Sequence, residues 1–139
     1  MTNTTCAQCG IVNLMNRPIK FRAWDSENSK MIHWISMRGW MMDSLNGDHI
    51  MQFTGLLDKN GQEIYEGDIV SVVHGTGMEG MKSTREKRFY CEVYFTNGGF
   101  RYKFPQDYGN YRFGKHLTRT EVVGNIYEHH HLLLNTPTK

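Results

Sequence analysis

The chain has few cysteines and no long apolar run. Its 139 residues include three cysteines, which cannot all pair within one chain. We therefore expect reduced thiols and no disulfide framework. No apolar stretch approaches the roughly 18 residues that span a membrane. The apolar run 11–15 is too short and too polar for a signal-peptide core. We therefore expect a cytoplasmic protein with no membrane partner.

The sequence also lacks the short motifs of common enzymes. It contains no Gly-x-Ser-x-Gly, no Walker phosphate loop and no His-Glu-x-x-His. Four carboxylates gather near the middle of the chain: Asp58, Glu63, Glu66 and Asp68. Their positions beside turn glycines favour turn capping over acid–base catalysis, which needs a second group with a displaced pKa. We predict that the protein is not an enzyme. An unrecognised hydrolase or metal protein ranks third, after the two binding hypotheses given below.

Turn signals in the central part of the chain predict β structure. Asn60-Gly61 suits a type I′ hairpin turn, and Gly67 allows the backbone to reverse before the apolar run 69–73. Residues 50–73 should therefore form turn-punctuated antiparallel strands. The expected core residues of this segment are Ile64, Ile69 and either Val72 or Val73.

Alternating runs elsewhere predict further hairpins. One joins residues 19–24 to 30–35, another joins 89–95 to 100–104 across Asn97-Gly98-Gly99, and 121–127 is a closing strand. In 100–104 the aromatic side chains should face one side and the cations the other. The connecting segments are expected to be a loop or short helix at 36–48, a long loop at 74–88 and an irregular stretch at 105–118.

About six short strands at close spacing predict a mainly β protein, a β-rich α+β protein at most. The expected form is a small, strongly bent antiparallel sheet or an SH3-like barrel with long loops. We divide the chain into an N-terminal extension (1–17), a single β domain (18–128) and a C-terminal tail (129–139).

Three sequence blocks carry a family resemblance. Ile19–Asp25, Met51–Val70 and Glu121–Glu128 occur in an order that resembles the YopX family, small proteins carried mostly by bacteriophages and prophages. Residues 98–100 are a weaker fourth match. The resemblance implies a phage or prophage origin, and hence the cytoplasm of a bacterial host. It carries over no catalytic residue.

Two binding hypotheses follow from residues outside these blocks. Trp and Met are enriched where proteins meet, and residues 31–42 are rich in both. The leading hypothesis is a modulator or inhibitor of host machinery, such as an antiviral nuclease system. Such a protein would contact a host protein or protein complex. Assembly of the chain into a homo-oligomer is also compatible with the sequence. The partner-binding candidates are Trp40, Met41, Met42, Lys82, Arg85, Lys87 and Arg88.

The alternative is direct nucleic-acid binding. Residues 82–119 hold nine Lys and Arg against three Asp and Glu, a net charge of +6, although the whole chain carries +2. The segment is also aromatic, and cations beside rings suit single-stranded nucleic acid. A half-buried strand gives the same pattern, because its aromatic residues face the core and its cations face the solvent. The candidates on this hypothesis are Arg101, Lys103, Arg112, Lys115 and Arg119.

Cys6-Ala-Gln-Cys9 resembles half of a zinc knuckle. A structural site needs four ligands, and neither Cys91 nor the histidines at 129–131 have a standard partner spacing. We therefore predict no metal and no cofactor.

Overall fold

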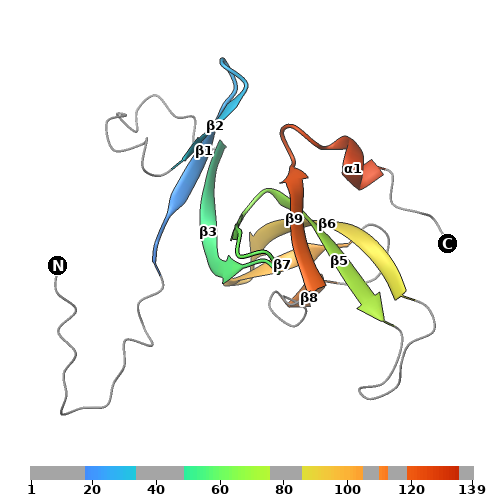
Figure 1. The fold of residues 1–139 in the computed structure, drawn as a ribbon. Helices are drawn as coiled ribbons and strands as arrows, with labels where there is room; N and C mark the ends of the chain where they lie inside the picture. The colour runs from blue at the N-terminus through green and yellow to red at the C-terminus, as the bar shows by residue number, and fades with distance from the viewer. Residues whose placement is uncertain (1–17, 34–48, 76–85, 105–109, 113–118, 135–139) are drawn as a thin grey trace, which may run out of the picture.

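The computed structural model describes residues 18–33, 49–75, 86–104, 110–112 and 119–134. For residues 74–75, 86–87 and 110–112 it describes the strand pairing alone. Nine strands and one short helix lie within these ranges (Figure 1). They are β1 (Phe21–Asp25), β2 (Lys30–His33), β3 (Ile50–Leu57), β4 (Glu63–Tyr65), β5 (Asp68–Gly75), β6 (Glu86–Thr96), β7 (Gly99–Lys103), β8 (Asn110–Arg112), β9 (Thr120–Asn125) and α1 (His131–Leu134).

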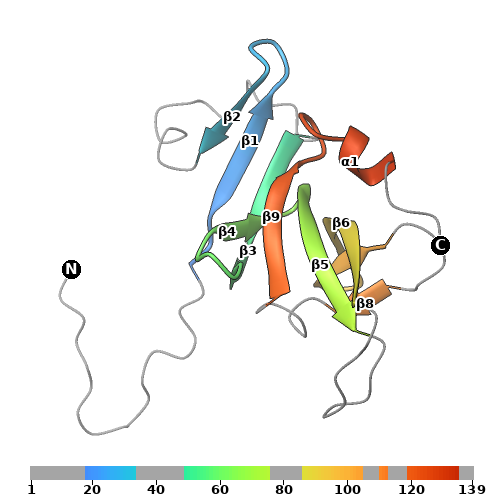
Figure 2. The same ribbon diagram turned by 45° about the vertical axis from the view of Figure 1, so that its right-hand side comes forward.

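The strands form two antiparallel sheets. The first has the order β2-β1-β3-β4 and the second has the order β8-β7-β6-β5-β9. Figure 2 shows β1 to β3 standing beside β9 and β5, while β5 and β6 curve away around the core. The second sheet curls into a half-barrel. The prediction of a mainly β protein with a strongly bent antiparallel sheet is confirmed.

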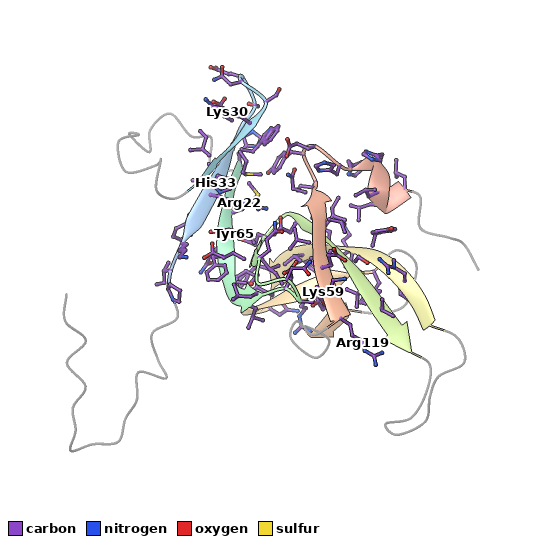
Figure 3. All side chains as sticks on the ribbon, viewed as in Figure 1. Arg22, Lys30, His33, Lys59, Tyr65 and Arg119 are labelled. Carbon is purple, nitrogen blue, oxygen red and sulfur yellow. The ribbon has the colours of Figure 1, made fainter. Side chains whose placement is uncertain are left out.

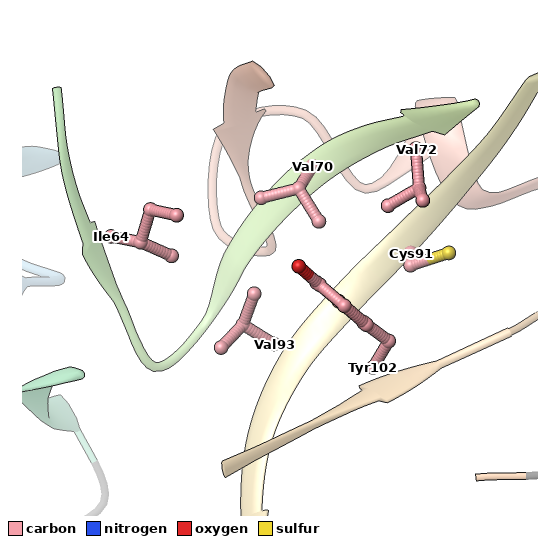
Figure 4. Close-up of a cluster of buried hydrophobic side chains, with 6 residues drawn as sticks. All are labelled: Ile64, Val70, Val72, Cys91, Val93 and Tyr102. Atoms are coloured by element: carbon pink, nitrogen blue, oxygen red, sulfur yellow. The ribbon is translucent and has the colours of Figure 1, made fainter. Parts of the chain in front are cut away.

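The core of the half-barrel lies against the inner face of the second sheet, and β4 of the first sheet contributes one residue to it, Ile64. Along β5 and β6 its members alternate with residues of the opposite face, as the period of two requires. Figure 4 shows the cluster, in which the Tyr102 ring lies among aliphatic side chains and Cys91. Each member is fully buried: Ile64, Val70, Val72, Cys91, Val93 and Tyr102. Ile69 is also fully buried but pairs with Glu92 on the other face, so all three predicted core positions are confirmed.

The turn at Asn60-Gly61 differs from the prediction. A type I′ turn needs positive φ at both central residues, but only Gly61 has it, at +82°. The Gly61 N–H donates to the Asp58 carbonyl at 3.0 Å, and the Asp58 N–H donates to the Gln62 carbonyl at 2.8 Å. The first bond closes a β-turn over residues 58–61, and the second closes a wider loop that includes the left-handed Gly61. Asp58 selects this loop because its side chain binds the amides inside it.

The turn between β6 and β7 has the positive φ angles that a type I′ turn requires. Asn97 has φ of +49° and Gly98 has φ of +75°, and Thr96 pairs with Gly99 directly before and after them. The predicted hairpin is confirmed. The β1–β2 hairpin is confirmed as well, with register pairs from Asp25–Lys30 to Arg22–His33.

Two predicted loops contain strand. Residues 74–75 extend β5 and residues 86–88 begin β6, so the loop predicted at 74–88 is shorter than expected. The predicted irregular stretch 105–118 contains β8. These strands were missed because their residues carry no apolar alternation; backbone pairing with a neighbouring strand forms them instead. The described residues hold nine strands, more than the six or so expected, and β8 is one of the additional ones.

Candidate binding surface

Asp58 joins the β3–β4 loop to the last strand. One carboxylate oxygen, Oδ1, accepts the N–H of Asn60 at 2.8 Å and of Gln62 at 2.9 Å. The other, Oδ2, accepts the N–H of Val122 in β9 at 2.9 Å. Burial raises the pKa of Asp58, but these three amides and the Lys59 charge outweigh it and hold the pKa below its usual value.

The same loop covers the free edge of β9. The Lys59 N–H donates to the Thr120 carbonyl at 2.9 Å, and Lys59 Nζ lies 2.6 Å from Glu121 Oε2. Figure 3 shows Lys59 beside β9. The opposite edge of β9 pairs with β5. An edge strand with free amides invites pairing with another chain, so this loop closes one side of the half-barrel.

Replacing Asp58 should destabilise this closure. We expect Asp58→Ala to lower the free energy of unfolding by about 2 kcal/mol at pH 7, because it leaves three amide donors without their charged acceptor. Urea unfolding followed by tryptophan fluorescence measures the change. Asp25→Ala is the matched control, since Asp25 accepts amides only within its own exposed turn, and its loss should be smaller.

The effect of Asp58 should also depend on pH. Its folded pKa lies below the unfolded value of 3.8, so its contribution is complete above that value and is lost as pH falls through the folded pKa. The stability difference between wild type and Asp58→Asn should therefore shrink below about pH 4. A difference of equal size at pH 7 and pH 3 would contradict this role.

A buried ion pair joins the first sheet to the Gly67 turn. Arg22 Nη2 lies 2.6 Å from Asp68 Oδ1, and both side chains are almost fully buried. Arg22 also donates to the Glu66 carbonyl at 3.3 Å, and its guanidinium carbon lies 4.6 Å from the centre of the Tyr65 ring. Figure 3 shows Arg22 and Tyr65 together. Burial raises the pKa of Asp68, while the Arg22 charge and the Tyr65 N–H oppose that rise.

The remaining carboxylates of the central segment also make structural contacts. Glu66 accepts the Gln52 N–H at 3.0 Å, and Glu63 pairs with Lys20 and accepts the Tyr65 hydroxyl at 2.8 Å. Asp68 accepts the Tyr65 N–H at 2.8 Å, as predicted for a carboxylate at a chain reversal. All four carboxylates near the central hairpin therefore position backbone or pair with a cation.

Most of the predicted protein-binding residues lie outside the described part of the chain. These are Trp40, Met41, Met42, Lys82 and Arg85. Lys87 and Arg88 were predicted to lie in a loop, but they belong to β6, where they pair with His74 and Val73. Arg88 is exposed, and its Nη1 donates to Ser71 Oγ at 3.3 Å.

The strand register brings some of the predicted nucleic-acid contacts together. Arg101 lies directly opposite Arg112 across β7 and β8, and Lys103 is two residues along the same face. Arg119 precedes β9, at the other edge of the sheet, so it does not join them. Lys115 lies outside the described residues. As predicted, Tyr102 faces the core and the cations of β7 face outward.

One further residue on this face belongs to the aromatic segment 82–119 but was not among the predicted contacts. Tyr94 of β6 lies directly opposite Arg101 and is half-buried. Its neighbour Val93 is fully buried in the core, so Tyr94 faces outward with the cations. The alternation of Tyr90, Glu92 and Tyr94 with apolar residues is the sequence signal for this. We call Tyr94, Arg101 and Lys103 the cationic face.

An open concavity lies beside the tip of the β6–β7 hairpin. It has a volume of about 350 Å³ and is lined by Thr54 and Leu56 of β3 and by residues 97–101. Phe95, which is 50% exposed, packs edge-to-face on Phe100 with ring centres 5.2 Å apart. We call this region the hairpin concavity. Phe95 was not singled out from the sequence, because nothing local shows that the hairpin extends past the core.

The described residues provide little for a metal ion. Within those ranges no group of three or more His, Cys, Asp or Glu side chains is placed to hold one. Cys6 and Cys9 lie outside them. Cys91 is buried, and burial raises the pKa of its thiol to about 12. His129 packs on Gly124, and its Nδ1 accepts the Asn125 N–H at 3.3 Å.

The short helix α1 follows that contact and lies against β6. Residues 129–134 thus pack on the β domain, although they were predicted as a tail. No helix in the described part of the chain is long and apolar enough to cross a membrane.

Comparisons with known proteins agree with this fold. The structure is similar to the crystal structure of protein EF1440 from Enterococcus faecalis, with a TM-score of 0.55 and 25% sequence identity, covering 84% of this chain and 98% of that one. No curated protein matches the sequence. A family model described as "YopX protein" matches residues 35–134, which contain two of the three blocks that carried the resemblance. The chain belongs to the YopX family.

Proposed function

We propose that this protein works by binding and not by catalysis, as a phage or prophage protein that modulates or inhibits host machinery in the bacterial cytoplasm. The proposed partner is a host protein, bound at the hairpin concavity. The observation that carries the proposal is the half-exposed Phe95, which packs on Phe100, a residue that lines that concavity. Exposed aromatic rings beside a hollow are typical anchors of protein interfaces.

The chemistry of the concavity defines the kind of partner it fits. Leu56 and Phe100 supply apolar lining, and the edge of the opening carries Arg101. A partner that inserts an apolar side chain and places a carboxylate beside the Arg101 guanidinium would match both features.

The arrangement of the carboxylates supports binding over catalysis. Asp58 and Asp68 are engaged by backbone amides, and Asp68 also by Arg22. Their shifted pKa values have structural causes, because their hydrogen bonds and charge partners hold the loop and the turn in place.

The experiment begins with tagged protein expressed in a bacterial host. Captured proteins are identified by mass spectrometry, and the purified partner is titrated by calorimetry. We expect Phe95→Asp to weaken binding at least tenfold, since a buried aromatic anchor carries a large part of interface energy. The matched control is Leu134→Asp, because Leu134 is an exposed apolar residue on α1, 73% accessible, and this change should leave binding unchanged.

Two results would overturn this proposal. The purified partner could bind Phe95→Asp as tightly as wild type, or it could lose affinity equally for Leu134→Asp. Either result would place the interface away from the concavity. Thermal unfolding of both variants separates lost binding from lost folding.

A further inference from the structure

We infer that the cationic face of the second sheet binds single-stranded nucleic acid. This surface consists of Tyr94, Arg101 and Lys103. It is separate from the anchor residues of the hairpin concavity, and the inference does not depend on a protein partner. Arg101 borders both surfaces, so it is left out of the tests below.

The cations of this face are poorly neutralised within the described part of the chain. Arg101 lies on the outward face of β7, in register with Arg112 of β8. Glu92 is the acidic residue opposite Lys103. Its carboxylate lies 3.7 Å from a Lys103 side chain that is 67% exposed, and such exposed pairs contribute little. The Lys103 charge therefore remains available to a bound anion.

The ring beside these cations distinguishes the class of anion. Tyr94 lies directly across from Arg101 and is half-buried, with Lys103 farther along β7. Sheet faces that hold aromatic rings and cations stack unpaired bases while the cations contact phosphates. The combination of ring and cations favours a single strand.

Fluorescence anisotropy with two labelled 20-mers, oligo-dT and oligo-rU, tests the inference. We expect a Kd on the order of 1–100 µM at physiological salt, which weakens as salt is raised from 50 to 200 mM. Lys103→Gln should reduce the slope of log K against log salt by about 0.7, the value for one phosphate contact on a single strand. Tyr94→Leu should weaken binding about tenfold, and Tyr94→Phe should retain it because the ring remains.

One variant should change affinity in the opposite direction. Glu92→Gln removes the carboxylate beside Lys103 and should tighten binding about threefold, whereas damage to the fold would weaken it. Lys30→Gln is the charge-matched control, because Lys30 is an exposed lysine in the β1–β2 hairpin (Figure 3). It should leave affinity and salt slope unchanged.

The inference is overturned if neither oligonucleotide binds with a salt dependence. It is also overturned if Tyr94→Leu keeps wild-type affinity or if Lys30→Gln lowers affinity as much as Lys103→Gln. Equal competition by poly-glutamate at matched charge would likewise overturn it, because it would indicate a general site for acidic proteins.

Discussion

Replacing Arg22 by Met should lower the free energy of unfolding by about 3–5 kcal/mol, because it leaves the Asp68 carboxylate buried without its cation. The two side chains are 9% and 2% exposed, so little water reaches the abandoned charge. A small domain has about 5–15 kcal/mol of stability in total. The variant should therefore be only marginally folded at 37 °C, and urea unfolding at 25 °C measures the loss.

Two comparisons show whether the abandoned charge causes this loss. Arg22→Met combined with Asp68→Asn removes both charges and keeps a side-chain oxygen for the Tyr65 amide, so it should recover part of the stability. Lys59→Met breaks the exposed pair with Glu121 and should cost less than about 1 kcal/mol. If the double variant were as unstable as Arg22→Met alone, packing of the Arg22 side chain would be the cause.

Gly67→Val should destabilise the protein by about 4 kcal/mol, through a strained backbone and a steric clash. Gly67 has φ of +74°, which a β-branched residue adopts poorly. A Cβ there would lie 3.0 Å from Met51 Sδ. Met51 is 3% exposed and its sulfur contacts Arg22 at 3.7 Å, so it has little room to move.

The backbone around Gly67 cannot shift easily to accommodate a side chain. The Gly67 N–H donates to the Val93 carbonyl and its own carbonyl accepts the Ile126 N–H, both at 2.9 Å. Gly98→Val is the matched control, because Gly98 has φ of +75° but no atom within 4 Å of its Cβ position. It should cost about 1–3 kcal/mol. Thermal unfolding of the two variants would contradict this account if their losses were equal.

Local sequence predicted the strands and turns wherever a short-range signal decides them. Alternation along residues 100–104 correctly separated the cations from the core, because side chains point to opposite faces of a strand in turn. Asn97-Gly98 and Gly67 correctly marked left-handed backbone, which few other residues adopt. The same logic failed at Asn60-Gly61, where the Asp58 side chain competes for the turn amides and stabilises a wider loop.

Only the tertiary structure decided which residues share a surface. Tyr94 and Arg101 are opposed because of a register that depends on the whole hairpin, and Phe95 is exposed because β6 continues past the core. Arg22 and Asp68 are 46 residues apart and carry no local sign of pairing. Burial and cross-strand contact are properties of the assembled sheets. The sequence by itself determined the family, the β class and the turn glycines. The register of β6 and β7 created the cationic face, and the packing of the two sheets created the concavity and the buried ion pair.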